Sequence, residues 1–411
     1  MLTNERRAGR YTAWGLTWLA YASYYLGRKS FSVVKSSLRV SLGVSERALG
    51  LIDTFYLAAY ALGLFFSGYV GDRVGARRLI TFGLAVSALC CAAFGATSAA
   101  LWFGVLFFIN GLAQSTGWPG TTRAMAEWTT AQNRGTVMAF WATCYQVGSI
   151  VASDFAAYLL RSSGWRAAFF VPAACMLAVA LLIFSFLKRG DVTAAGAAVG
   201  TELDAEARRS AQREALRSPV LWSFGASYFF IKYVRYALLF WLPYYLHGTL
   251  GHEVDRAAYV SNAFEAGGIA GVIAIGVLSD RVRSWSRASL SMLSLVGLAL
   301  ALLVCSALPQ RDVWLTVVAL AAVGALLFGP DALLSGAAAQ DIGGAAAAAT
   351  ATGLVNGVGS LGGILEGLSL PAISAHLGWR AMFPLLALLA VCAALALIPA
   401  ARRPDTRGAD L

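Results

Sequence analysis

The segment Gly68-Tyr-Val-Gly-Asp72-Arg73-Val-Gly75-Ala-Arg77-Arg78 (68–78) follows a long apolar run, and a degenerate copy of it returns later in the chain. The copy, Gly276-Val-Leu-Ser-Asp280-Arg281, begins 208 residues after Gly68. Two other landmarks repeat at nearly the same offset: Gly164-Trp-Arg with Gly378-Trp-Arg (214 residues), and Arg28 with Arg235 (207 residues). Because three independent landmarks repeat at nearly one offset, the chain is predicted to be a tandem repeat of two similar halves.

The composition predicts an integral membrane protein. Of the 411 residues, 58% are hydrophobic and 13% are charged, whereas a soluble domain carries about 25% charged residues. Apolar runs of about 20 residues recur along the chain, which is the length of a membrane-spanning helix and not of a barrel strand. The polar, basic residues 1–10 lack the apolar region and cleavage site of a removable signal peptide.

We therefore predict an all-α membrane protein whose twelve transmembrane helices form two pseudo-symmetric six-helix bundles. The predicted domains are an N-terminal bundle (1–187), a linker (188–218) and a C-terminal bundle with a short tail (219–411). Within the linker, the charged stretch 201–217 is predicted to be a surface helix. The expected spans lie at approximately residues 12–34, 48–70, 79–97, 100–125, 136–160, 166–187, 219–246, 257–279, 288–307, 313–338, 346–370 and 380–400.

The distribution of basic residues predicts the orientation of these spans. An even number of spans puts both termini on one side, and 20 of the 32 Lys and Arg residues fall in the termini and loops of that side, against 8 in the loops of the other. The positive-inside rule makes the richer side cytoplasmic. We expect the protein to lie in the cell (inner) membrane with both termini in the cytoplasm, and the scattered charge argues against nucleic-acid binding despite the net charge of +11.

The first predicted span carries two adjacent cations, Arg28 and Lys29, after three tyrosines. A charge at membrane depth costs about 2.5–3.5 kcal/mol on insertion scales unless water or a partner receives it. At helical spacing Tyr21, Tyr25 and Arg28 share one face, so this face is predicted to line a polar cavity and to bind an anion. The alternative is that the two cations reach to the headgroup layer.

The repeat favours anion binding, because the seventh predicted span also carries an arginine with a lysine nearby, Arg235 and Lys232. Reaching to the headgroups would not require such a pair to recur at matched depth. We expect Arg28 and Arg235 to face one another across the interface between the halves. For Lys29, which is offset from the face of Arg28, both readings stay open.

The segment 68–78 resembles the loop between the second and third helices of the major facilitator superfamily: glycine, three residues, Asp-Arg, any residue, glycine, any residue, two basic residues. Asp72, at a helix end, could pair with a cation or a helix N-terminus in one conformation and act as a gate latch; the alternative is charge that only sets topology. The predicted gating residues are Gly68, Asp72, Arg73, Gly75, Arg77, Arg78, Arg134, Asp280 and Arg281.

Within that superfamily the chain resembles the organophosphate:phosphate antiporter family. The segments that carry this resemblance are Tyr24-Tyr-Leu-Gly-Arg-Lys-Ser-Phe31, Gly117-Trp-Pro119, Asn133-Arg-Gly135 with Trp141 and Val147-Gly148, Val234-Arg-Tyr236 with Trp241-Leu-Pro243, Phe264-Glu-Ala-Gly-Gly268 and Phe328-Gly-Pro-Asp331. The resemblance implies electroneutral exchange by rocker-switch alternating access, with Arg28 and Arg235 clamping phosphate. Arginine suits this role because its planar donor fork matches phosphate oxygens.

The sequence departs from glycerol-3-phosphate transporters at four positions of the resemblance. It has Tyr145 where they have histidine, Gln146 for asparagine, Leu64 for lysine and Lys232 for tyrosine. The phosphate site survives this comparison, whereas the organic substrate stays open. The predicted substrate-binding residues are Arg28, Arg235, Lys232, Lys29, Tyr21, Tyr25, Tyr145 and Gln146.

Two acids in spans of the C-terminal half, Glu265 and Asp331, are predicted to neutralise Lys232 and Arg235 when the site is empty, because unpaired buried charges are costly. A role in proton coupling is the alternative. The six cysteines and three histidines lack metal-ligand spacing, and no catalytic constellation is present. We expect neither enzymatic activity, a cofactor nor a metal.

The prediction is thus a monomeric carrier in the lipid bilayer that exchanges a phosphorylated metabolite of the sugar phosphate, glycerol phosphate or phosphoglycerate type for inorganic phosphate. Two alternatives remain. One is a proton-coupled carrier of carboxylate anions that uses Glu265 or Asp331. The other is a membrane sensor that binds sugar phosphate without transporting it.

Overall fold

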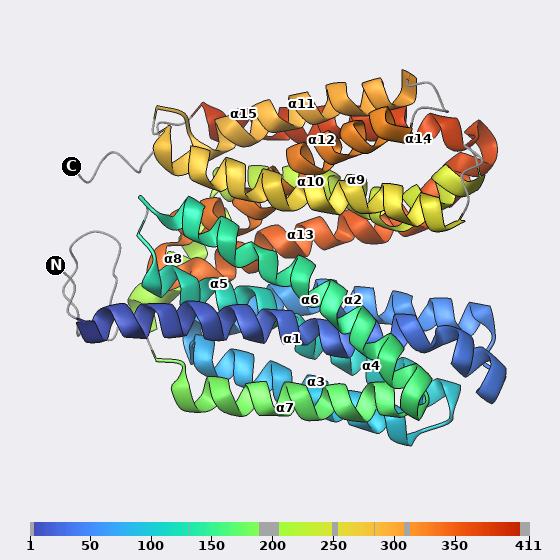
Figure 1. Ribbon diagram of the computed structural model, residues 1–411. Helices are drawn as coiled ribbons and strands as arrows, with labels where there is room; N and C mark the ends of the chain where they lie inside the picture. Colours follow the sequence, from blue (N-terminus) through green and yellow to red (C-terminus); the bar gives the residue numbers. More distant parts are fainter. Residues whose placement is uncertain are drawn as a thin grey trace. The chain divides into compact units, whose positions relative to one another are not determined.

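The computed structural model describes residues 4–130, 132–188, 205–248, 254–282, 284–307 and 313–402, and every regular element in these ranges is a helix (Figure 1). The helices of the first half are α1 (Asn4–Leu42), α2 (Glu46–Val74), α3 (Ala76–Ala96), α4 (Ala100–Gln114), α5 (Gly117–Trp128), α6 (Arg134–Ser163) and α7 (Ala167–Phe186). The linker contains α8 (Ala205–Arg217). The prediction of an all-helical fold is confirmed.

The second half contains α9 (Pro219–Gly248), α10 (Val254–Arg281), α11 (Arg287–Ala307), α12 (Val313–Ala332), the π-helix η1 (Leu333–Ala338), α13 (Ala339–Leu377), the 3-10 turn η2 (Trp379–Ala381), α14 (Met382–Ala396) and α15 (Ile398–Ala401). The chain breaks inside α13, where Gly344 has φ 56° and Ala347 is also non-helical. This break divides the α12–α13 run at the place between the tenth and eleventh predicted spans.

Each of the twelve predicted spans corresponds to a long helical segment, if α4–α5 and α12–η1 are each taken as one span. The first helix extends well beyond its predicted span at both ends. Seven helical stretches, counted over the described residues alone, are long and apolar enough to cross a membrane. The spans outside these stretches are α1, α4–α5, α6 and α9. The pair α4–α5 is outside because it consists of two short helices of 15 and 12 residues, whereas polar and charged residues such as Arg28, Gln146 and Lys232 lower the mean hydropathy of α1, α6 and α9.

The break between α4 and α5 has a local cause. Proline at position 119 has no N–H, so the carbonyl of Ser115 lacks its intrahelical donor. The hydroxyl of Ser67 in α2 lies 3.0 Å from the Ser115 carbonyl oxygen and also contacts the carbonyl oxygen of Gly63, so its single hydrogen is shared between the two acceptors.

Contacts divide the chain into two compact units that do not coincide with its two halves. Unit 1 comprises Met1–Thr130, Trp141–Ala215 and Ile342–Gly357, and unit 2 comprises Ala131–Phe140, Leu216–Asp341 and Val358–Leu411. The start of α6 therefore belongs with the second half, and part of α13 belongs with the first. Each half contributes one segment to the unit formed mainly by the other.

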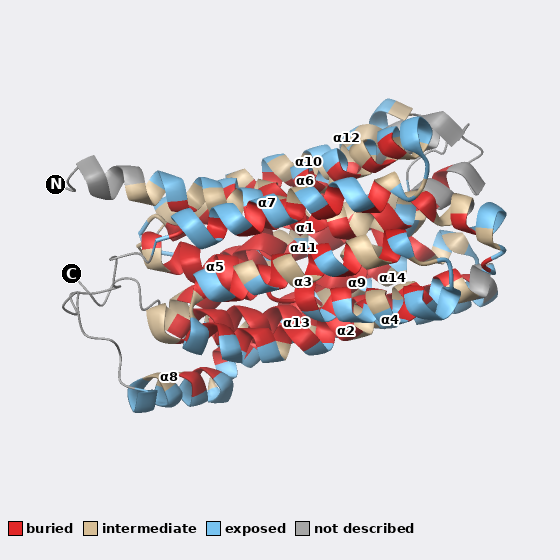
Figure 2. Cartoon of the chain, turned by 90° about the horizontal axis from the view of Figure 1, so that it is seen from below, coloured by how far each residue is buried: buried red, intermediate tan, exposed pale blue. Residues whose placement is uncertain are grey.

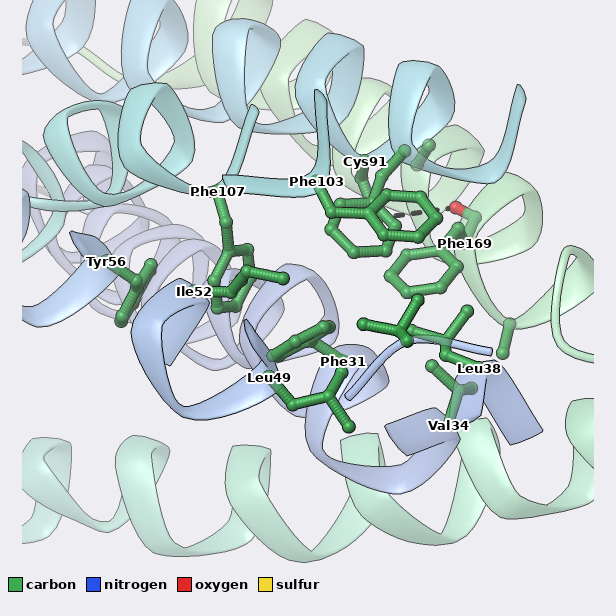
Figure 3. Packing of buried hydrophobic residues seen from close by; sticks show 14 of the residues in the cluster. Phe31, Val34, Leu38, Leu49, Ile52, Tyr56, Cys91, Phe103, Phe107 and Phe169 are labelled. Atoms are coloured by element: carbon green, nitrogen blue, oxygen red, sulfur yellow. Dashed lines mark hydrogen bonds between the residues drawn. The ribbon is translucent and has the colours of Figure 1, made fainter. Parts of the chain in front are cut away.

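The core of unit 1 is aromatic (Figure 3). Phe94 of α3 stacks on Phe103 of α4 with 4.3 Å between ring centroids and on Phe169 of α7 with 4.4 Å, and Phe31 of α1 packs against Phe107 at 4.7 Å. These rings are at most 4% exposed. Interlocked rings on four helices fix the position of α1, which carries Arg28.

Exposed residues lie along the helices (Figure 2), and many of them have large apolar side chains. Leu181, Phe184 and Phe186 of α7, for example, are 59%, 52% and 58% exposed. Large apolar side chains exposed in this number are unfavourable in water and favourable against lipid tails. The pattern agrees with a membrane-embedded bundle whose polar groups point inward.

Candidate functional site

In unit 1, Arg28 of α1 is held by neutral groups. Its Nε donates to Oε1 of Gln114 at 3.2 Å. Its guanidinium lies 4.8 Å from the ring centroid of Tyr25, 5.1 Å from that of Tyr60 and 5.7 Å from that of Tyr56. Aromatic faces attract a cation without neutralising it. Among the described residues no carboxylate forms an ion pair with Arg28, and its two terminal amino groups donate no hydrogen bond.

The side-chain amide of Gln114 is held in place by further hydrogen bonds. Its Oε1 also accepts from the Tyr56 hydroxyl at 2.8 Å, and its Nε2 lies 3.3 Å from both Ser87 Oγ and Asn110 Oδ1. Asn110 in turn donates to the carbonyl oxygen of Gly27 at 3.3 Å. This buried network sets the orientation of the arginine through Nε and leaves its planar fork available to an anion.

The predicted aromatic residues of unit 1 gather beside Arg28. Tyr21 packs against Tyr25 (6.1 Å between centroids), Trp118 (5.2 Å) and Trp141 (5.8 Å). Tyr145 packs edge-on against Trp118 at 6.5 Å. The structure therefore brings Tyr21, Tyr25 and Tyr145 into one aromatic cluster on α1, α5 and α6.

Two further predicted residues lie in unit 1. Gln146 follows Tyr145 on α6 and is 4% exposed, and neither atom of its amide has a hydrogen-bond partner among the described residues. A buried amide in that condition is costly unless something outside the described chain satisfies it. Lys29 is half-buried.

In unit 2, Arg235 of α9 is ion-paired. Its Nη1 lies 3.1 Å from Oδ2 and 3.3 Å from Oδ1 of Asp331 on α12, and its guanidinium lies 5.0 Å from the centroid of Phe328. Lys232, one turn earlier on α9, is 4% exposed and donates from Nζ to Ser360 Oγ of α13 at 2.9 Å. Glu265 of α10 is half-buried. Asp331 is thus placed against the arginine, as the charge-compensation hypothesis requires.

The carboxylate of Asp72, at the end of α2, is buried among four donors. Arg123 Nη1 of α5 donates at 2.6 Å, the backbone N–H groups of Ala349 and Thr350 at 3.0 and 2.7 Å, and the hydroxyl of Thr350 at 2.5 Å. The break in α13 makes this point a new helix N-terminus, so the N–H groups of these two residues have no acceptor within the helix and are available to Asp72. Asp72 therefore has a cation and a helix N-terminus at once.

Gly68 allows α2 and α13 to approach closely enough for this contact. A Cβ atom at position 68 would lie 2.7 Å from the carbonyl oxygen of Ala349. Gly75 has φ +85°, ends α2 and begins α3. Arg73, Arg77 and Arg78 are exposed, which is the placement expected for charge that sets topology.

Unit 2 repeats the same arrangement around Asp280, at the end of α10. Its carboxylate accepts from the backbone N–H groups of Gly135 and Thr136 at 3.1 and 2.6 Å, and from Arg287 Nη2 at 3.2 Å. The donor pairs 135–136 and 349–350 are 214 residues apart, the offset of the Gly-Trp-Arg landmarks. The tandem repeat therefore extends to individual hydrogen bonds.

Arg134 belongs to this second cluster. It forms an ion pair with Asp341, which also accepts from Arg287 Nε at 2.7 Å. Arg281, in contrast, is exposed. Of the predicted gating residues, Gly68, Asp72, Gly75, Arg134 and Asp280 are thus at close contacts or turns, and the four remaining arginines are on the surface.

The sequence profile of the Major Facilitator Superfamily matches residues 17–366. The chain belongs to this superfamily. It is 30% identical to "Sugar phosphate exchanger 3" of Bos taurus, covering 93% of this chain and 91% of that protein, and 28% identical to "Probable hexose phosphate transport protein" of Chlamydia pneumoniae, covering 92% and 88%. The prediction of an organophosphate exchanger family is confirmed by these relatives.

Solved structures of the major facilitator superfamily share the fold. The proton:xylose symporter XylE aligns with a TM-score of 0.72 over 95% of each chain, at 15% sequence identity. At this identity the likeness concerns the fold alone. The chain is accordingly a multi-pass membrane protein of a transporter superfamily.

The sequence did not predict several residues that contact these sites. They are Gln114, Tyr56 and Tyr60 at Arg28, Ser360 at Lys232, and Arg123, Thr350, Arg287 and Asp341 in the clusters around the Asp72 and Asp280 carboxylates, which are called the two latches from here on. For some of these residues the sequence carried a signal, the spacing of polar residues along an apolar run. Asn110 and Gln114 are amides one turn apart in an apolar run, and Tyr56 and Tyr60 have the same spacing.

Proposed function

We propose that this protein is a secondary active transporter that exchanges a phosphorylated organic metabolite for inorganic phosphate by alternating access. The metabolite is of the sugar phosphate, glycerol phosphate or phosphoglycerate type, and the protein works as a monomer without a cofactor. The observation that carries the proposal is the Arg28 site. Among the described residues its guanidinium donates only through Nε, has tyrosine rings around it and pairs with no carboxylate, and such a group is suited to a multiply charged oxyanion.

The relatives support the same substrate class. They are named as a sugar phosphate exchanger and a hexose phosphate transport protein, and each aligns over most of its length. Phosphate is common to both sides of the proposed exchange, so a single site that recognises phosphoryl oxygens serves both substrates. In the proposal, Arg28 and Arg235 both donate to the phosphoryl group.

The two arginines act differently in this proposal. Arg28 receives phosphoryl oxygens without giving up an anionic partner. Arg235 exchanges Asp331 for the substrate, so its own charge is compensated by Asp331 when the site is empty and by the phosphoryl group when the substrate is bound. Tyr21, Tyr25, Tyr145 and Gln146 contact the organic part, and Lys232 and Lys29 add positive potential.

The latches at Asp72 and Asp280 form the gate in this proposal. Each carboxylate holds two helices of its unit together through backbone donors that must separate when the helices move apart. Because a buried carboxylate loses several hydrogen bonds at once, release is a discrete event and not a gradual one. We propose that these latches lie at the cytoplasmic ends of the helices, with both termini on that side and the protein in the cell inner membrane.

The test is exchange of labelled phosphate by purified protein in phosphate-loaded vesicles. Arg28→Ala and Arg235→Ala are expected to abolish exchange, whereas the matched control Arg209→Ala, on the exposed face of α8, is expected to retain it. Exchange that survives both site substitutions would exclude the two-arginine site. Uptake that depends on a pH gradient and ignores internal phosphate would instead indicate a proton-coupled carrier.

A further inference from the structure

Helix α8, in the linker between the two halves, has a narrow buried face (Figure 2). Among its residues Gln212 is 0% exposed and Ala215 is 3% exposed, whereas Arg209, Arg213 and Glu214 are exposed. A helix that only covered apolar surface would bury apolar side chains. The most deeply buried residue of α8 is an amide, and it belongs to unit 1.

Gln212 makes two donor contacts. Its Nε2 lies 2.8 Å from the carbonyl oxygen of Tyr69 in α2 and 3.0 Å from Thr350 Oγ1 in α13. Its Oε1 has no hydrogen-bond partner among the described residues. Leaving a buried carbonyl oxygen unsatisfied is unfavourable, so the two donated bonds have to offset it.

The hydroxyl of Thr350 connects Gln212 to the latch. It carries one hydrogen and lies 2.5 Å from Asp72 Oδ2, which can only accept. Thr350 therefore donates to Asp72 and accepts from Gln212. Because an amide nitrogen can only donate, Gln212 excludes the rotamer in which the hydroxyl would turn its hydrogen toward α8.

We propose that Gln212 is a positioning residue of the gate: through Thr350 it orients a donor onto Asp72, and through Tyr69 it ties α2 to α13. The linker helix is then the third component of the latch, beside α2 and α13. Its place in a transport cycle rests on the proposed function. Its effect on the latch itself does not.

The test is hydrogen exchange at the backbone amides of Ala349 and Thr350, followed by mass spectrometry on the full-length protein without substrate. Gln212→Met keeps the length of the side chain and removes both donors. Loss of neutral hydrogen bonds at one site is expected to accelerate exchange of these amides about three- to tenfold. Arg213→Ala, the exposed neighbour, is expected to leave exchange unchanged.

A double-substitution cycle separates positioning from general packing. Thr350→Val removes the hydroxyl and keeps the backbone N–H. If Gln212 acts through that hydroxyl, Gln212→Met accelerates hydrogen exchange less in the Thr350→Val background than it does in the wild-type protein. Multiplicative effects, or no acceleration by Gln212→Met alone, would overturn the proposal. If Gln212→Met does not fold, Gln212→Glu, which keeps the shape and sets a carboxylate against Thr350, provides the same comparison.

Since no substrate is present, this experiment and the vesicle exchange assay fail independently. Faster hydrogen exchange in Gln212→Met, together with no phosphate exchange by the wild-type protein, would support the role of Gln212 in the latch and contradict the proposed function. Unchanged hydrogen exchange in a protein that exchanges phosphate would do the reverse.

Discussion

The Arg28 and Arg235 sites occupy equivalent helices of a tandem repeat and solve the same physical problem in opposite ways. Arg28 is held by an amide and three tyrosine rings, with no carboxylate paired to it among the described residues. Arg235 is paired with Asp331. A cation without a counter-ion is costly to bury and ready for an anion, whereas a paired cation is cheaper to bury and has to change partners. The repeat thus conserves the arginine and not its surroundings.

The largest expected effect follows from removing Arg28, the arginine that an amide holds. Arg28→Ala deletes two charge-assisted donors, each worth about 1.5–3 kcal/mol, so phosphate exchange should fall by at least about 100-fold. Arg28→Lys keeps the charge but not the planar fork, and it should also lose most activity. Exchange rates in vesicles measure both. Wild-type rates in Arg28→Lys would show that charge alone is sufficient.

The second prediction gives the Arg28 site a carboxylate like the one beside Arg235. Gln114→Glu places a carboxylate of the same shape beside Arg28 and should form the ion pair that unit 2 already has. The substrate must then displace an acid at both arginines, and the KM for phosphate should rise about tenfold, because one competing charged interaction is worth about 1.5 kcal/mol or more. Gln114→Met, which leaves no charge, should raise the KM less. Equal effects would contradict the proposed role of neutrality.

The third prediction concerns the paired arginine. Asp331→Asn leaves Arg235 without its carboxylate, and breaking a buried ion pair costs about 3–5 kcal/mol; because Arg235 is partly exposed, the lower end is expected. The Tm of the empty protein should fall, and inorganic phosphate should raise the Tm more in the variant than in the wild type. Thermal unfolding with and without phosphate measures this. A variant that phosphate stabilises no more than the wild type would show that Asp331 and phosphate do not compete.

The smallest effect is expected at the surface of the loop motif. Arg77 lies 4.8 Å from the centroid of Phe184 and is exposed, and such a contact contributes about 0.5–1 kcal/mol. Arg77→Gln should change the exchange rate less than twofold, whereas Asp72→Asn, at the buried end of the same motif, should change it clearly. Rates of the two variants in one vesicle preparation provide the comparison.

The sequence was informative where a residue type conflicted with its surroundings. Apolar length predicted the helices, the repeated landmarks predicted two similar halves, and the charges at membrane depth pointed to Arg28 and Arg235. These signals are local or periodic, so one chain is enough to read them. The pairing of Arg235 with Asp331 was accessible because few acids lie in the second half of the membrane region.

The remaining contacts depend on which helices meet. Gln114 supports Arg28 from 86 positions away, and Asp72 is bound by backbone N–H groups of residues 349 and 350, which carry no side-chain signal. Backbone donors become available only where a helix breaks, and the break at Gly344 and Ala347 reads in the sequence as one more glycine and alanine in a run of small residues.

The exchange of segments between the units has a consequence for biosynthesis. Asp72 leaves the ribosome long before Ala349 and Thr350 exist, so during synthesis its carboxylate lacks donors that it has in the finished protein. Domains usually fold as units, the N-terminal one first, but unit 1 is not complete until Ile342–Gly357 has been made. During synthesis the first half is therefore in the membrane before its last segment has been made, and the end of α2 at Asp72 lacks its backbone donors until residues 349 and 350 have been synthesised.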